Sequence, residues 1–412
     1  MEQQAEHSPA AGADPWHGWN PFDPEYDRER LYEHLHRLRE SDPVNETPVG
    51  LWRLTRYDDV VRLLREVPAG MRRSDGGSYT DYLTRQGKHG RGQFMLFQDP
   101  PTHTRLRKLV SRAFTPRAID RTRENIQRIV DEYLDRMAGS GEMDVIADLA
   151  LPLPSTVICE MLGVPGTDRP MFTEWTSHAT HAISPSPFPD PVALERAERA
   201  ADQLADYFIH LIGERRKSLS DDLMSALIRA EEEGDRLSTV ELVSQTIGLL
   251  IAGFETTIGL IGNGVRALIL HPAELAELRA NPTLIGTAVE ECLRWDGPIP
   301  ITLRILHADA EFGGKRIPKD AVVLGVLAAA NRDPEVFSDP DRFDIAREPN
   351  EHLAFGGGIH FCLGAHLARL EAQIAIGSLF GRFRDVELES ERREWGASAF
   401  RVPGRLPIRI RA

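Results

Sequence analysis

Hydrophobic positions recur with helical spacing along most of the chain, and strand-like patterns are confined to short stretches. Proline and glycine divide the helical pattern into separate segments. Short apolar or alternating stretches typical of strands occur at 50–55, 304–306 and 321–326. We therefore expect a mainly α protein with a small β-sheet assembled from distant segments. We expect a single domain over residues 21–412.

The longest predicted helix begins at a capping box, Ser238–Glu241, and meets no proline before Pro272. A helix of about 30 residues would be about 45 Å long and would cross the whole molecule. Residues 247–260 are apolar on nearly every face, but Glu255 and Arg266 lie too close together for a membrane span. Such a helix in a soluble protein belongs in the core.

Composition is that of an ordinary globular protein: 412 residues, of which 41% are hydrophobic and 27% charged. The formal net charge of −14 argues against nucleic acid as the main partner. Residues 1–20 are polar and have no apolar run, so we expect a disordered tail and neither signal peptide nor membrane anchor. Three widely separated cysteines offer no disulfide framework, which favours a reducing compartment. We expect a cytoplasmic monomer.

Cys362 lies in a glycine-rich segment, residues 355–364, directly before a predicted helix at 365–372. The N-terminus of a helix lowers the pKa of a thiol placed there. Three glycines permit backbone angles and close approach that a side chain would prevent: Gly356, Gly358 and Gly364. One thiolate with no second cysteine nearby suits the axial ligand of a haem iron. The alternative is an inert buried thiol.

The segment 355–364 resembles the haem-binding signature of the cytochrome P-450 superfamily, F-G-x-G-x-H-x-C-x-G, at every specified position. The resemblance extends from about Trp52 to Ile408. It implies the cytochrome P-450 fold, haem b as cofactor and Cys362 as the iron ligand. It also implies that three loop residues border the haem: Phe355, Gly356 and Gly364. Asp320 departs from the family, which usually has glycine in that turn, but aspartate tolerates many turns.

The sequence Ala252–Thr257 (A-G-F-E-T-T) places a carboxylate and hydroxyls in the apolar middle of the long helix. Buried polar groups are costly unless they serve a cavity or a proton path. The stretch resembles the family's A-G-x-E/D-T motif. The resemblance implies that Thr256 hydrogen-bonds dioxygen, that Glu255 relays protons, and that Ala252 and Gly253 border the haem. The alternative is a bond from Thr256 back to a carbonyl one turn earlier.

Glu291 and Arg294 share one face of a helix expected between Asn281–Pro282 and Gly297–Pro298. They match the family's E-x-x-R, which implies a third, loop-locking arginine. We assign Arg347 to that position, with Arg342 as the alternative.

His103 and Arg107 lie one turn apart in a D-P-P-x-H-T-x-x-R segment, which the resemblance assigns to the haem propionates. The resemblance adds Arg304 and His360 to this set.

The resemblance implies a monooxygenase that inserts one oxygen atom of dioxygen into a largely hydrophobic small molecule. The chain has no dinucleotide fingerprint and no four-cysteine pattern, so we expect electrons from a separate ferredoxin and its reductase. Seven basic residues between Arg105 and Arg123 could dock such a donor, or could be a solvated helix face. The rival functions are a peroxide-driven enzyme and a non-enzymatic haem sensor or auxiliary protein. Glu255 and Thr256 argue against both.

The resemblance also gives a set of residues for the substrate pocket, most of them apolar: Leu249, Ala252, Gly253, Ile299, Ile301, Thr302 and Phe400. Two segments, about 71–97 and 167–191, are expected to control access. Neither set identifies the substrate.

Overall fold

The computed structural model describes residues 19–20, 23, 26–76, 93–180, 191–232, 235–396 and 400–411. As predicted, helices dominate this part of the chain. They are α1 (Leu31–Ser41), α2 (Tyr57–Arg65), α4 (Thr102–Ser111), α5 (Pro116–Asp120), α6 (Arg123–Met137), α7 (Pro152–Met161), α8 (Arg169–Thr180), α9 (Pro191–Lys217), α10 (Leu223–Arg229), α11 (Thr239–Leu270), α12 (Pro272–Ala280), α13 (Ile285–Asp296), α14 (Leu327–Ala330) and α15 (Ala365–Arg382).

The three predicted strands all form, and they meet in one five-stranded sheet of order β1-β2-β10-β7-β3. In this sheet β10 pairs parallel to β2, and the other pairs are antiparallel. The strands of this sheet are β1 (Val44–Glu46), β2 (Leu51–Leu54), β3 (Ala69–Gly70), β7 (Thr302–Leu306) and β10 (Val322–Gly325).

Smaller sheets hold the remaining strands. A three-stranded sheet near the C-terminus has the order β11-β14-β4, and three two-stranded pairs complete the set. Their bounds are β4 (Glu142–Asp144), β5 (Glu231–Glu232), β6 (Asp235–Arg236), β8 (Ala310–Phe312), β9 (Lys315–Ile317), β11 (Asp385–Leu388), β12 (Glu394–Trp395), β13 (Pro403–Arg405) and β14 (Pro407–Arg411).

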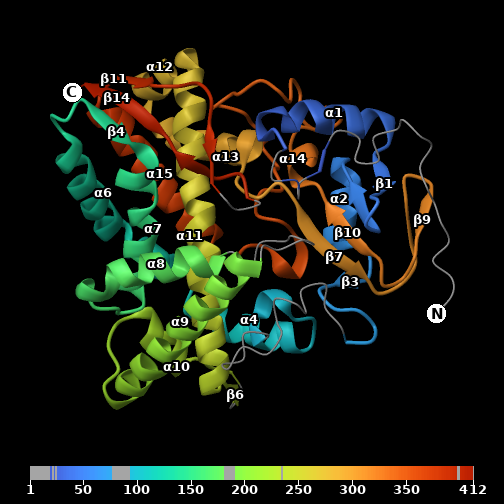
Figure 1. Cartoon of the computed structure of the whole chain (residues 1–412), viewed down its shortest axis with the longest axis horizontal. Helices are drawn as coiled ribbons and strands as arrows, with labels where there is room; N and C mark the ends of the chain where they lie inside the picture. Colours follow the sequence, from blue (N-terminus) through green and yellow to red (C-terminus); the bar gives the residue numbers. More distant parts are fainter. Residues whose placement is uncertain are drawn as a thin grey trace.

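Helix α11 has the predicted start and stop. The Ser238 hydroxyl accepts from the Glu241 N–H and the Glu241 carboxylate accepts from the Ser238 N–H, and the helix ends before Pro272. Its 32 residues span about 48 Å. In Figure 1, α11 (yellow) runs the full height of the molecule, with α6 to α10 on one side and the five-stranded sheet with α1 and α2 on the other. It therefore forms the centre of the core, as predicted.

Among the described residues, α11 alone is long and apolar enough to cross a membrane. In its most apolar stretch, 72% of the residues are buried inside the protein, which is the behaviour of a core helix.

Two local expectations need correction. Trp19, assigned to the disordered tail, is 1% exposed; its carbonyl accepts from Arg53 at 2.9 Å, and its ring lies 5.6 Å from that guanidinium. Residues 1–18 lie outside the described part. Asn281, expected to cap a helix, makes no capping bond: Pro282–Leu284 forms a 3-10 turn and α13 begins only at Ile285.

Candidate active site

The predicted cysteine loop folds into a compact turn that holds Cys362 directly before α15. The Cys362 N–H donates to the Phe355 carbonyl at 3.0 Å, and the Phe361 N–H donates to the Gly358 carbonyl at 3.1 Å. Residues Gly358–His360 form a short 3-10 helix, and α15 begins at Ala365. The thiol is therefore presented at a helix start, as the sequence predicts.

Gly358 is required by the path of this loop. Its φ of 65° lies in the left-handed region, and a Cβ built there would be 2.1 Å from the Leu64 carbonyl oxygen. Backbone packing against α2 therefore excludes any side chain at this position.

The Cys362 side chain is accessible to solvent although protein atoms surround it on most sides. Burial raises the pKa of its thiol, while backbone N–H groups of Gly364 and Ala365 and the charges of Arg107 and Arg369 lower it. The helix start therefore lowers the pKa of Cys362, as predicted, but the effect of burial is larger and the net pKa is raised.

One face of α11 is open in the middle of this otherwise buried helix. Besides Glu255, the accessible residues there have the spacing of a single helical face: Leu249, Ala252, Gly253 and Thr256. Phe254 and Thr257, which point elsewhere, are buried. A Cβ built on Gly253 would meet no atom within 4 Å. This face can therefore receive a large flat group.

Thr256 has a partner one turn earlier in α11, and Glu255 is partly accessible. The Thr256 hydroxyl donates to the Ala252 carbonyl at 2.8 Å, which is the back-bond raised as the alternative reading of this residue. Its oxygen keeps lone pairs that can accept a further hydrogen bond. Glu255 is half-buried and interacts electrostatically with Arg28. Their catalytic roles stay predictions.

The four predicted propionate ligands gather in a cationic cluster. The rings of His103 and His360 lie 4.3 Å apart. Burial, with the charges of Arg304, His103 and Arg107, lowers the pKa of His360 to about 3. Burial also lowers the pKa of Arg304 to about 10, and Asp99 opposes that effect. The cluster carries a positive charge that one carboxylate does not balance.

The residues of this cluster fit a haem. Neither ring nitrogen of His103, nor Nε2 of His360, has a hydrogen-bond partner among the described residues. Buried polar groups of this kind are normally satisfied, and two propionates would supply the missing acceptors and negative charge. Arg107 reaches the same region and donates to the Phe361 carbonyl at 2.8 Å, so it also supports the cysteine loop.

The E-x-x-R pair is fully buried in α13. Arg294 donates to both carboxylate oxygens of Glu291, at 2.7 and 2.8 Å, and both side chains are 0% exposed. Arg347 supplies the third side chain, with Nε 3.2 Å from the Glu291 carboxylate. Arg342, the alternative, contributes its backbone carbonyl, which accepts from Arg294 at 3.0 Å. Through Asn331 this network also reaches the Leu353 N–H, just before the loop.

Asn331 makes two hydrogen bonds in this connection. Its carbonyl accepts from Arg294 at 2.9 Å and its side chain accepts from the Leu353 N–H at 2.7 Å. The ion pair is thereby connected to the start of the cysteine loop.

Comparison with known proteins agrees with this geometry. Residues 72–395 match the family model for cytochrome P450. The chain belongs to the cytochrome P450 family. It is 44% identical over 369 residues to cytochrome P450 CYP107DY1 of Priestia megaterium, covering 87% of this chain and 89% of that one. It is 39% identical over 395 residues to the 6-deoxyerythronolide B hydroxylase of Saccharopolyspora erythraea, covering 92% and 96%.

Among solved structures, P450BioI in complex with an acyl carrier protein ligated to hexadec-9Z-enoic acid is similar, with a TM-score of 0.85 and 37% identity. The match covers 93% of this chain and 98% of that one. The bacterial polyketide synthase P450 PksS gives a TM-score of 0.86 at 36% identity, covering 96% and 100%. This P450 is therefore a haem-dependent monooxygenase of the family fold predicted from its sequence.

Sequence reasoning missed one ion-pair network of this P450. Glu290 accepts from Arg369 through two bonds of 2.7 Å and lies 3.1 Å from Nε2 of His352. Its burial raises its pKa, but these partners outweigh burial and bring the pKa to about 2. The Arg369 guanidinium lies 4.4 Å from the Phe355 ring in the cysteine loop. The only sequence signal was a second glutamate beside Glu291.

The predicted pocket residues do not all meet at α11. Leu249 and Phe400 are partly buried against the core cluster that contains α11. Ile301 packs with α1 and the five-stranded sheet, and Ile299 packs with α2 and neighbouring strands. The Thr302 hydroxyl accepts from Arg304 at 3.3 Å. The assignment of these residues to the pocket stays a prediction. Residues 77–92 and 181–190 of the two access segments lie outside the described residues.

The basic stretch does not form one continuous surface. Arg105 turns away and pairs with Asp235 and Glu241, the latter at 2.6 Å. Arg117 and Arg121, on and beside α5, are exposed. The stretch is therefore divided between a partly exposed ion cluster at Arg105 and the surface around α5.

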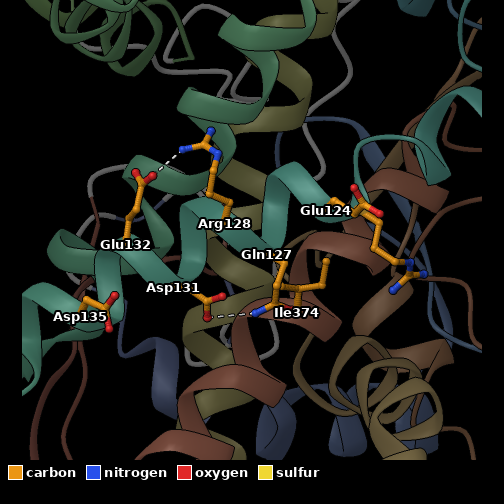
Figure 2. A pocket seen from close by; sticks show the side chains of 8 residues that line it. Glu124, Gln127, Arg128, Asp131, Glu132, Asp135 and Ile374 are labelled. Carbon is orange, nitrogen blue, oxygen red and sulfur yellow. Dashed lines mark hydrogen bonds and ion pairs between the residues drawn. The ribbon is translucent and has the colours of Figure 1, made fainter.

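A separate groove of about 670 Å³ lies between α6 and α15. Within it Arg128 donates to Glu132 and Gln127 donates to Asp131, as Figure 2 shows. Ile374, which lines it, lies nine residues, or about 14 Å, beyond the first residue of α15. It is distinct from the cysteine loop.

Proposed function

We propose that this P450 binds haem b through Cys362 and oxidises a largely hydrophobic small molecule at the open face of α11. The observation that carries the proposal is this open face, with Gly253 exposed and Thr256 partly exposed in the middle of a buried helix. The haem, when bound, supplies the dioxygen chemistry and the thiolate promotes it electronically. The chain supplies binding, orientation, proton delivery and exclusion of water.

The cationic cluster and the E-x-x-R network would together hold the haem and the cysteine loop. His103, Arg304 and His360 would bind the propionates, because their buried nitrogens and positive charge suit two carboxylates. Arg107 would also bind a propionate while it donates a hydrogen bond to the Phe361 carbonyl in the cysteine loop. Glu291, Arg294 and Arg347 would keep the loop in place through Asn331.

Proton delivery would involve Glu255 and Thr256. A carboxylate that is half-buried can exchange protons with solvent, and Thr256 lies on the open face beside it. Because the Thr256 hydroxyl donates to Ala252, its oxygen can accept a hydrogen bond from a group on that face. Replacing Thr256 by alanine should therefore divert electrons to hydrogen peroxide.

The substrate is expected to be apolar over most of its surface. Leu249, Ala252 and Phe400 offer apolar contacts. A polyketide macrolactone is the first class to test, since one relative is named a 6-deoxyerythronolide B hydroxylase and another belongs to polyketide biosynthesis. Spin-state titration would rank 6-deoxyerythronolide B against testosterone, which is bound in a solved structure of the similar P450 CYP109E1, and against hexadec-9Z-enoic acid.

A ferredoxin is the proposed electron donor, docking over α5 and the cysteine loop. His366 at the start of α15 lies 3.0 Å from Asp120 of α5, so α5 borders the loop. Exposed Arg117 and Arg121 make this surface attractive to an acidic protein. R117E and R121E should slow reduction by ferredoxin, whereas R199E on the remote helix α9 should not.

One assay separates the monooxygenase from its rivals. Product should form with ferredoxin, reductase and reduced nicotinamide, and not efficiently with peroxide alone. Efficient turnover with peroxide alone would favour the peroxide-driven enzyme, and no product from any source would favour a sensor or auxiliary protein. We further propose a single-domain cytoplasmic monomer, which fractionation and light scattering would test.

A further inference from the structure

Glu290, on α13, binds one residue just before the cysteine loop and one residue on α15. Its carboxylate accepts two hydrogen bonds of 2.7 Å from Arg369 and lies 3.1 Å from Nε2 of His352. The Ala354 N–H donates to Nδ1 of His352 at 3.2 Å, so the ring proton is on Nε2 and is donated to Glu290. The paired bonds from Arg369 fix the direction of its guanidinium as well as its position.

The ring of Phe355, the first residue of the cysteine loop, lies against this network. The Arg369 guanidinium is 4.4 Å from its centre, within the range of a cation–π contact. The His352 and Phe361 rings have their centres 6.0 and 6.3 Å from it, at tilted angles typical of attractive ring pairs. Core packing covers Phe355 only in part, so these three contacts supply the rest of its support.

The backbone of Phe355 connects this support to the proposed haem ligand. The Cys362 N–H donates to the Phe355 carbonyl at 3.0 Å, and this bond brings the two sides of the loop together. Gly356 follows Phe355 with a φ of 69°, so the chain turns directly after it. A rotation of the Phe355 peptide would move the acceptor of the Cys362 N–H. The position of the thiol therefore depends on the position of Phe355.

The two adjacent glutamates of α13 hold successive residues at the start of the loop. The network of Glu291 reaches the N–H of Leu353. Glu290 reaches the next two residues, Ala354 and Phe355, through its two partners. Three consecutive residues are thus tied to one turn of α13.

We propose that Glu290 and Arg369 are positioning residues for Phe355, and that through Phe355 they hold Cys362 in place as the ligand of the haem iron. The inference rests on the haem ligation proposed above. The Arg369 and Glu290 side chains are 30% and 26% exposed, so their pairing alone adds little to the stability of the protein. Residues that orient a metal ligand contribute instead to retention of the metal. The main effect of this pair is therefore on how firmly haem is held.

The test measures the release of haem from the haem-loaded protein to an excess of apomyoglobin. R369Q should accelerate release by about tenfold, the lower end of the effect of removing a residue that orients a metal ligand. E290Q should act in the same direction, and the double variant should be no faster than R369Q, because both residues act through one contact.

The matched control is R382Q, which removes another ion pair between α15 and a neighbouring helix. Arg382 is the last residue of α15, at the opposite end from the cysteine loop. Its side chain is 34% exposed, close to the value for Arg369, and it pairs with Asp135 on α6. R382Q should leave the rate of haem release unchanged.

A variant of Phe355 tests whether Arg369 acts through the ring. F355L keeps an apolar side chain but removes the aromatic face that the guanidinium contacts. R369Q should accelerate haem release in the wild-type background and cause no further acceleration in the F355L background. Equal acceleration in both backgrounds, or none in either, would overturn the proposal. If R369Q does not bind haem, E290Q takes its place in this comparison.

The reduced carbon-monoxide complex separates this inference from the proposed function. If the wild-type complex lacks the thiolate-type Soret band, ligation by Cys362 is wrong and the inference fails with it. If the wild type shows that band and R369Q releases haem at the wild-type rate, ligation stands and the inference alone is overturned. The expected result is a thiolate-type band in the wild type that is lost faster in R369Q and E290Q than in R382Q.

Discussion

Replacing Glu291 by alanine should destabilise the protein and release haem. The carboxylate accepts hydrogen bonds from Arg294, Arg347, Asn350 and the Asp344 N–H, and it is 0% exposed. Removing one partner of a buried ion pair costs about 3–5 kcal/mol because the other charge is left uncompensated. Arg294 would still donate to three backbone carbonyls, so we expect a loss near the lower end, about 3 kcal/mol.

Denaturant unfolding at pH 7, together with the ratio of haem to protein, would measure this effect. The matched control is E277A, an exposed glutamate on α12, which should change stability by less than about 0.5 kcal/mol. Replacing Glu291 and Arg294 together by leucine should cost less than E291A, because no buried charge remains from that pair. Stability of E291A within about 1 kcal/mol of wild type, with full haem content, would refute the reasoning.

Three further variants test other parts of the structure. Burial raises the pKa of Glu371 from its usual 4.5 to about 8. The folded protein should therefore lose up to about 5 kcal/mol of stability as the pH rises from 4.5 to 8, and E371Q should abolish this loss. Parallel plots of melting temperature against pH for the two proteins would contradict this. G358A should lower haem content and melting temperature, because its Cβ would meet the Leu64 carbonyl at a φ of 65°, whereas G381A on α15, with open space around it, should be tolerated. R105A should lower stability by about 1 kcal/mol through its pair with Glu241 and leave the rate of reduction by ferredoxin unchanged; a large loss of that rate would restore Arg105 to the docking surface.

The sequence predicted those features that depend on local spacing. The capping box at Ser238 determines where α11 begins, and the glycine pattern around Cys362 determines a loop before a helix. Asp320 occupies a turn position where the family usually has glycine, and aspartate is expected to tolerate such turns. Its φ is 63°, and its carboxylate accepts from the Ser74 N–H at 2.7 Å, which agrees with that expectation.

The missed features depend on contacts between distant segments. Trp19 is buried because Arg53, 34 positions later, binds its carbonyl, and no local pattern marks that contact. Arg28 donates to the carbonyl of Phe400, 372 positions later. Glu290 and Arg369 are 79 positions apart. Charged residues of this kind look like solvated surface until the fold pairs them.

The most direct test of Cys362 as the haem ligand is the absorption spectrum of the reduced carbon-monoxide complex. Cys159 and Cys292 are buried, so Cys362 is the accessible one of the three. Wild type, C159S and C292S should all show the thiolate-type Soret shift, and C362H should lose it while still binding haem. A wild-type complex without that shift, or a C362H complex that keeps it, would contradict thiolate ligation by Cys362.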